Sequence, residues 1–320
     1  MLSFTYIFIL SLANMNILKE QDIKSKLIPN DTLFNDIHII NQKFDILPND
    51  KEHYGASIAY QDIQELREDF VYNLSDTIVD WVYSSDKFKA LKEKELKKGK
   101  SESVAFSTIR RKVRQKFRTS DDSSLLIQGQ FGELLLFHFI QKCMEAVPLL
   151  RKMPITTSPK HERFGADAIH YKIRGDKNII ILGEAKTYSS DYKFKSAFED
   201  AITSILNTYK SHREELDLYV HEDFLDEEMN NIAEAYLDNK LKNVEVHLVC
   251  IVIYNETKIL RKNTEKDITK EIETIIEERY REFDNNKIPI DENAILSRIT
   301  YIVFPIWKLK ELLEKFEKVL

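Results

Sequence analysis

Two carboxylates and one lysine stand at a spacing that could bind a metal ion. Asp167 belongs to one apolar segment, and Glu184 and Lys186 belong to the next, with a tight turn at residues 174–177 between them. Such a turn predicts a β-hairpin in which Asp167 lies directly opposite Glu184. Side chains alternate along a strand, so Glu184 and Lys186 point to the same face. The three charged groups are therefore expected to converge on one patch.

The same register makes further predictions about the hairpin. Gly165 is expected opposite Lys186, where it leaves room for the longer side chain. The second strand is apolar on both faces over residues 179–183, as buried central strands are. A register shifted by one residue would instead turn Asp167 away from Glu184.

The chemistry that this arrangement suggests is the binding of a hard divalent cation. Two carboxylates that face each other across a strand pair repel, and a cation between them would remove that penalty. Oxygen ligands suit Mg²⁺ or Mn²⁺, and the carbonyl group of Ala185 is a candidate for a further ligand. The same residues also fit the exposed end of an ordinary hairpin, because Asp, Glu and Lys are common on surfaces.

A third carboxylate, Glu133, lies in an apolar helix predicted to run from a cap at residues 119–124 to about residue 146. Its neighbours at helical spacing are mostly apolar, and a carboxylate there is costly to bury without a partner. Gly129 and Gly132 allow this helix to approach a sheet closely. Glu133 is therefore interpreted as a third metal ligand. The alternative is a helix-edge residue that reaches water or pairs with Arg163.

The elements that position these residues predict a mixed α/β (α+β) fold, with a mixed sheet flanked by helices. Strands are expected at residues 36–40, 149–155, 163–174, 177–186, 244–254 and 299–304. Helices are expected at residues 56–98, 123–146, 194–209, 221–241, 264–284 and 307–320.

The densest basic segment of the chain lies just before the Glu133 helix. As a helix it would present four arginines broadly together, namely Arg110, Arg111, Arg114 and Arg118. Such a row could contact the phosphates of a nucleic acid. A solvated helix face or a contact with a partner protein fits the segment equally well.

Composition limits how the chain could meet a nucleic acid. The 320 residues carry a formal net charge of -6, and 31% of them are charged. This balance excludes a protein that coats nucleic acid by its overall charge. An enzyme acting on nucleic acid would need a local basic patch, a metal ion at its acidic site, or a partner that delivers the substrate.

The cysteines and the N-terminus indicate a cytoplasmic protein with no membrane anchor. Cys143 and Cys250 lie in apolar runs, as buried thiols do, which argues against a disulfide framework or a zinc site. The apolar stretch at residues 4–13 lacks a positively charged start and is too short to span a membrane. Translation is predicted to begin at Met15, so that residues 1–14 are a start-site error or a local packing element.

The assembled motif set resembles that of the PD-(D/E)xK, or restriction-endonuclease-like, nucleases. More narrowly, residues 164–170 and 182–186 resemble the HamA family of the Hachiman anti-phage defence system. The proline that usually precedes the motif aspartate is replaced here by Ala166, and this change removes no ligand.

The resemblance implies a metal-dependent DNA nuclease effector in residues 120–320, preceded by a mainly helical region over residues 1–119. It also implies a HamB-type helicase partner. Asp167, Glu184 and Glu133 would hold Mg²⁺, and Lys186 would act beside them as a catalytic residue. Two alternatives stay open: a nuclease-like module that binds DNA or a partner without cutting, and a repair or resolvase-type nuclease.

Overall fold

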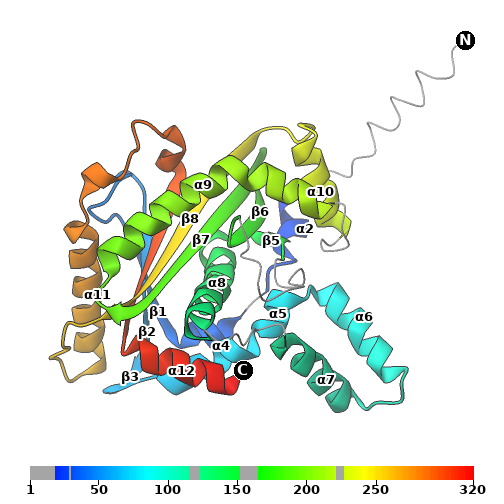
Figure 1. Cartoon of the computed structure of the whole chain (residues 1–320), viewed down its shortest axis with the longest axis horizontal. Coiled ribbons are helices and arrows are strands. Elements are labelled where there is room, and N and C mark those ends of the chain that lie inside the picture. The colour runs from blue at the N-terminus through cyan, green and yellow to red at the C-terminus, as the bar shows by residue number, and fades with distance from the viewer. Residues whose placement is uncertain (1–18, 29, 116–122, 152–164, 221–226) are drawn as a thin grey trace, which may run out of the picture.

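The computed structural model describes residues 19–28, 30–115, 123–151, 165–220 and 227–320. Their centre is a seven-stranded mixed sheet with the strand order β1-β2-β9-β8-β7-β6-β5 (Figure 1). The strands are β1 (Ile37–Gln42), β2 (His53–Ile58), β5 (Val147–Leu150), β6 (Ala168–Arg174), β7 (Lys177–Asp191), β8 (Val244–Glu256) and β9 (Ile299–Trp307). The predicted mixed α/β architecture is confirmed.

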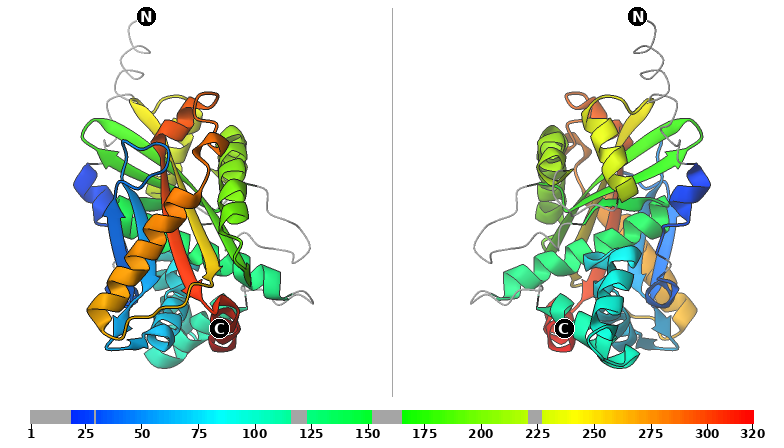
Figure 2. Two further views of the ribbon diagram at one scale, coloured as in Figure 1. Left: turned by 90° about the vertical axis from the view of Figure 1, so that its left-hand side faces the viewer. Right: turned by 90° about the vertical axis from the view of Figure 1, so that its right-hand side faces the viewer.

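Both faces of the sheet are covered, because its central strands are apolar on both sides. Strands β7, β8 and β9 run parallel, and β9 is buried from Ile299 to Ile306. Helices α9 (Phe194–Val220) and α11 (Glu265–Glu282) pack on one face (Figure 2). Helix α8 (Ser123–Met144) packs on the other, together with α4 (Arg67–Asp76), α5 (Ile78–Val82) and α12 (Leu309–Val319). Two hydrophobic cores therefore sandwich the sheet, one on each face.

The hairpin of β6 and β7 has the predicted register. Ala168 pairs with Gly183, Ile169 pairs with Leu182, and the ladder continues without a shift to the turn. Gly175 has a φ of +62° in that turn, a conformation that glycine adopts without strain. The alternative register, shifted by one residue, is excluded by this ladder.

The part of the chain before residue 119 is mainly helical but also builds the sheet. Its helices are α2 (Glu20–Lys24), α3 (Asp31–Asn35), α4 (Arg67–Asp76), α5 (Ile78–Val82), α6 (Ser85–Leu96) and α7 (Glu102–Arg114). Strands β1 and β2 pair with each other, and β2 joins β9 in parallel. The sheet therefore draws strands from both sides of residue 119, and that division of the chain stays a prediction.

The helix expected from residue 56 begins later than predicted. Strand β2 runs to Ile58, and a small hairpin of β3 (Tyr60–Gln61) and β4 (Gln64–Glu65) precedes α4. The residues of β2 form a strand because they pair with β1 on one side and, at Tyr54 and Gly55, with β9 on the other. Tertiary packing overrides the helical spacing of the apolar residues that follow.

The remaining helices follow the predicted order, with shifted ends. Helix α9 is longer than expected, α10 (Glu227–Leu237) ends four residues earlier than expected, and α12 spans Leu309–Val319. Within the described residues, no helix is both long and apolar enough to cross a membrane. Neither cysteine forms a disulfide; Cys250 is buried as predicted, and Cys143 is only partly buried. The predicted start at Met15 and residues 1–14 lie outside the described residues.

Candidate functional site

Asp167 lies immediately before β6 and is bound to β7 through both its backbone and its side chain. Its amide donates to the carbonyl oxygen of Gly183 at 3.0 Å. Its carboxylate oxygen Oδ2 accepts the amide hydrogen of Ala185 at 2.8 Å. These two bonds fix the carboxylate of Asp167 beside Glu184, as the hairpin register predicts.

Glu184 is the most deeply buried charged group of the hairpin, with 4% of the residue exposed. The hydroxyl of Thr208, on α9, donates to its Oε1 oxygen at 2.5 Å. The Nζ atom of Lys186 lies 3.7 Å from its Oε2 oxygen. A buried carboxylate with these two neighbours has a defined orientation.

The electrostatics of a neighbouring thiol show that Asp167, Glu184 and Lys186 share one region. Cys250 pairs with Glu184 across β7 and β8 and is fully buried. Burial raises the pKa of this thiol, and the charges of Glu184 and Asp167 raise it further while Lys186 opposes them. All three predicted hairpin groups therefore act on the same atom.

The space beside Gly165 is filled differently from the prediction. A Cβ atom at Gly165 would lie 2.1 Å from the Oε2 atom of Glu215, so Glu215 of α9 occupies the space that was assigned to Lys186. The same oxygen accepts the amide hydrogen of Ala166 at 2.8 Å, and Glu215 is buried. Glu215 therefore holds the backbone that leads into Asp167.

Helix α9 thus supports both halves of the hairpin motif, which the sequence pattern alone does not predict. Thr208 and Glu215 are seven residues apart, so they lie on one face of α9. That face also carries the buried residues Ala201, Ile205 and His212. The sequence does contain a signal for these two residues. Each is a polar residue at a core position of an amphipathic helix, the same feature that identifies Glu133.

Glu133 is half-buried on α8, beside a close contact with β7. A Cβ atom at Gly132 would lie 3.2 Å from the Cβ atom of Ala185, so the predicted close approach of this helix to a sheet is present. Because side chains alternate, Ala185 points to the α8 face, whereas Glu184 and Lys186 point to the α9 face. The structure brings three of the four predicted catalytic residues together, and Glu133 starts from the opposite face.

Metal binding at the hairpin stays a prediction. Within the described residues, no group of three or more His, Cys, Asp and Glu side chains is arranged to hold a metal ion. The two carboxylates of the hairpin still provide hard oxygen donors on adjacent strands, the chemistry that suits Mg²⁺ or Mn²⁺. The roles of Glu133 and of the Ala185 carbonyl as ligands remain predictions.

Of the four arginines predicted to contact phosphates, the three that the structure describes do not form one exposed row. Arg110 forms an ion pair with Asp76, and the Nε atoms of Arg110 and Arg114 are buried. Arg111 is exposed, and Arg118 lies outside the described residues. Helix α7 turns Arg110 and Arg114 toward the body because its buried side carries Ile109 and Val113.

The fold and the hairpin together define a restriction-endonuclease-like protein, with a mixed sheet between helices and a D…ExK set on its β6–β7 hairpin. A search of curated proteins gave no match. A model of the HamA family matches residues 32–320, nearly the whole chain. The chain belongs to the HamA family, and this membership assigns it a role in the Hachiman anti-phage defence system.

Proposed function

We propose that this HamA protein is a metal-dependent nuclease that hydrolyses phosphodiester bonds in DNA and acts with a HamB-type helicase. The observation that carries the proposal is the convergence of Asp167, Glu184 and Lys186 through the hairpin register. The overall acidic charge supports a partner that delivers the substrate.

Each residue of the hairpin has a distinct role in this proposal. Asp167 and Glu184 would hold Mg²⁺ or Mn²⁺, with Glu133 and the Ala185 carbonyl as further ligands. A bound divalent cation would polarise the phosphate and lower the pKa of a water molecule. Lys186 would orient the attacking water or stabilise negative charge that builds on the phosphate, as a compact ammonium group can.

Replacing Lys186 with alanine tests the proposal. We expect DNA cleavage by the protein with its helicase partner and Mg²⁺ to fall by roughly 10²-fold, because one group that stabilises the transition state is removed. The exposed Lys195 on α9, changed to alanine, is the matched control and should keep wild-type activity. Equal cleavage by the wild type and the Lys186 variant would refute the assignment, and so would no cleavage by the wild-type complex.

Calorimetry separates a catalytic site from a nuclease-like fold that only binds. Titration of the purified protein with Mn²⁺ should show binding that is lost when Asp167 is changed to asparagine. A protein with no metal binding in either form would favour the non-catalytic alternative, because a metal-dependent site must bind its ion before it reacts.

Replacing Thr208 with valine should lower cleavage by about tenfold, because the loss of one hydrogen bond to Glu184 costs about 1.4 kcal/mol. Valine keeps the shape of the side chain, and serine at the same position should restore most of the activity. Thr203, an exposed residue of α9 that donates to a backbone carbonyl, provides the control when changed to valine. Wild-type metal affinity and cleavage in Thr208→Val would show that the bond to Glu184 is not needed.

A further inference from the structure

Positive charge in this acidic protein is concentrated in one helical hairpin, defined as residues 85–115 and built from α6 and α7. The segment contains eleven Lys and Arg residues and four Asp and Glu residues, which gives a formal charge of +7. The whole chain carries -6, so the remaining residues together carry -13. An asymmetry of this size creates a strongly positive local potential on a negative body.

The hairpin is a defined structural unit that stands out from the sheet core (Figure 1). Phe88 of α6 meets Phe106 of α7 edge-on, with 5.9 Å between ring centroids. Glu95 is buried between the helices and binds the ammonium groups of three lysines at 2.6–3.0 Å, namely Lys98, Lys100 and Lys112. These hydrogen bonds hold the pKa of Glu95 well below its usual range. Part of the positive charge therefore serves to join the two helices.

Five other cations of the hairpin are exposed and take no part in that cluster. Lys89 is paired with Asp86, and the other four are Lys87, Lys94, Lys97 and Arg111. None of the four forms an ion pair with another described residue, whereas Arg110 is paired with Asp76. Lys87 and Lys94 are seven residues apart, so they lie along one side of α6. Lysines on long, mobile stems suit contacts with phosphates that do not depend on base sequence.

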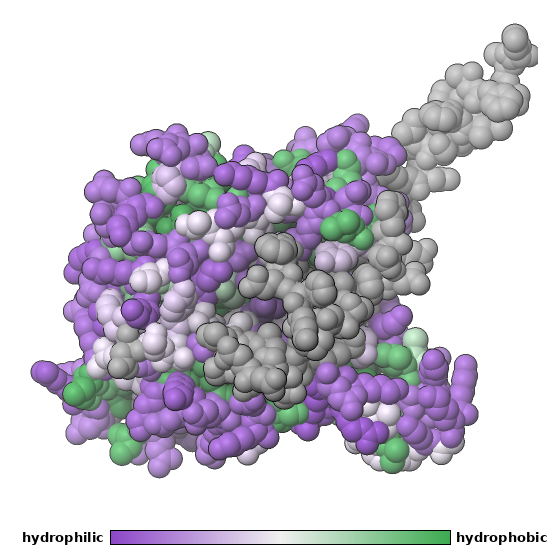
Figure 3. All heavy atoms as spheres, viewed as in Figure 1, coloured by the Kyte–Doolittle hydropathy of each residue, from purple (hydrophilic) through white to green (hydrophobic). Residues whose placement is uncertain are grey.

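The surface of the hairpin favours a polyanion over an apolar partner. In the view of Figure 3 the region over α6 and α7 is mainly hydrophilic, with small hydrophobic areas. The exposed apolar residues of α7 are Val104 and Phe106, and Phe106 is already in contact with Phe88. Single exposed apolar residues of this kind need no partner to explain them.

We propose that the α6–α7 hairpin binds the phosphodiester backbone of double-stranded DNA through Lys87, Lys94, Lys97 and Arg111. The proposal rests on the nuclease function above and assigns the surface that holds its substrate. It also moves the expected DNA contact from the arginine row of α7, two members of which are partly buried, to the exposed side of the hairpin.

The test compares two fourfold variants with the same change in charge. One changes Lys87, Lys94, Lys97 and Arg111 to glutamine. The other changes four exposed lysines outside the hairpin: Lys266, Lys270, Lys310 and Lys318. Both are made in the full chain with Lys186→Ala, and binding to a short duplex DNA is measured without divalent metal over a range of salt concentrations.

We expect the hairpin variant to bind DNA at least tenfold more weakly than its parent. The negative slope of log K against log[salt] should become shallower by about 0.9 for each phosphate contact removed. The control variant should keep the slope of its parent. Equal affinity and slope in the two variants would overturn the proposal. So would a hairpin variant that keeps DNA binding and loses the helicase, because the surface would then be a protein interface.

Two features keep this test independent of folding and of catalysis. Thermal unfolding of each variant confirms that the hairpin is intact; if the midpoint falls, the smaller variant Lys94→Gln with Arg111→Gln replaces it. Binding is measured without cleavage, so a protein that binds DNA through the hairpin but never cuts it refutes the nuclease function alone.

Discussion

Replacing Arg279 with methionine should lower the free energy of unfolding by about 3–5 kcal/mol, because it leaves a buried carboxylate without its counter-ion. Arg279 of α11 is 4% exposed, and Glu256 at the end of β8 is 2% exposed. The guanidinium Nε and Nη2 atoms donate to the two carboxylate oxygens of Glu256 at 2.9 and 2.7 Å. A paired, planar contact of this kind is the strongest form of ion pair.

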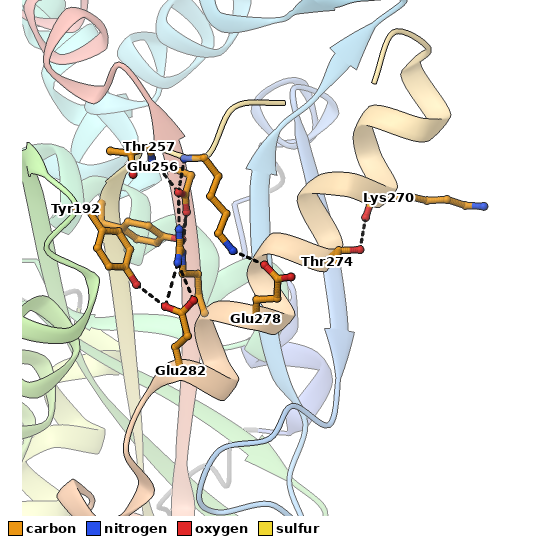
Figure 4. Close-up of polar contacts among 10 residues, drawn as sticks. Tyr192, Glu256, Thr257, Lys270, Thr274, Glu278 and Glu282 are labelled. Carbon is orange, nitrogen blue, oxygen red and sulfur yellow. Dashed lines mark hydrogen bonds and ion pairs between the residues drawn. The ribbon is translucent and has the colours of Figure 1, made fainter. Parts of the chain in front are cut away.

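The same guanidinium group makes two more contacts, one within α11 and one with the residue that follows β7. Its Nη1 atom donates to both carboxylate oxygens of Glu282 at 3.0 Å, and its plane lies over the ring of Tyr192 at 4.3 Å. Figure 4 shows Tyr192, Glu256 and Glu282 pointing toward one another at this junction. Tyr192 follows β7 directly, so the network lies where two parallel strands end.

The measurement is chemical denaturation of the variant beside Arg281→Met. Arg281 lies on the same helix and is exposed, so its replacement should change stability by less than about 0.5 kcal/mol. A change from glutamate to glutamine at Glu256 in the Arg279 variant should recover part of the loss, since the unpaired charge disappears. Equal stability of the two arginine variants would contradict the prediction.

The loss of stability in the Arg279 variant should depend on pH in one direction only. Burial alone would raise the pKa of Glu256, but its bonds to Arg279 and to backbone amides outweigh burial and lower that pKa. A lowered carboxylate pKa stabilises the fold at pH values above the unfolded-state pKa of about 4.3. The stabilisation disappears as pH falls through the folded-state pKa. The gap between wild type and variant should therefore narrow in acid.

The sequence was sufficient to predict the β6–β7 hairpin register, but not the contacts that other elements make with the site. A two-residue turn and strand alternation are local rules, and they placed Asp167, Glu184 and Lys186 correctly. A strand at residues 36–40 was also expected, and β1 spans Ile37–Gln42, but its place in the sheet was not expected. Strand β2 reaches the sheet through β9, which lies far away in the chain, and no local pattern encodes such a pairing.

The same limit explains the arginine row of α7 and the supports from α9. Helical spacing groups Arg110 with Arg111, but only the position of Asp76 decides which of them is held against the body. In the sequence, Glu215 is indistinguishable from the other charged residues of a long helix. Its role is visible only in the tertiary structure, where it contacts the backbone of residues 165 and 166. Buried polar contacts depend on tertiary structure, so sequence patterns find the candidate residues and not their partners.

Replacing Gly165 with alanine should displace Asp167 and reduce DNA cleavage by at least 10²-fold. Gly165 has a φ of +122°, where any other residue is strained by about 1–3 kcal/mol. The added methyl group would also meet the buried carboxylate of Glu215, which must then release the amide of Ala166. An unsatisfied buried amide costs about 1–3 kcal/mol more. Together these terms predict a loss of stability of about 2–6 kcal/mol.

Hydrogen exchange gives a readout of this change that does not depend on catalysis. The amide of Ala185 is protected by the carboxylate of Asp167, so its exchange should become at least tenfold faster when Asp167 moves. The matched control is Gly99→Ala, because Gly99 has a φ of +83° and open space where a side chain would lie. It should cost only about 1 kcal/mol and leave the exchange of Ala185 unchanged.

A second substitution isolates the contact with Glu215 from the backbone strain. Glu215→Ala makes room for the methyl group at residue 165, so the glycine change should cost less in that background than in the wild type. The difference is a coupling energy, expected at about 1 kcal/mol for side chains in contact. Additive effects of the two changes, or wild-type exchange at Ala185 in Gly165→Ala, would show that the α9 carboxylate does not position Asp167. A positive coupling would establish that the motif aspartate is placed by a glycine and a buried glutamate that lie outside the motif itself.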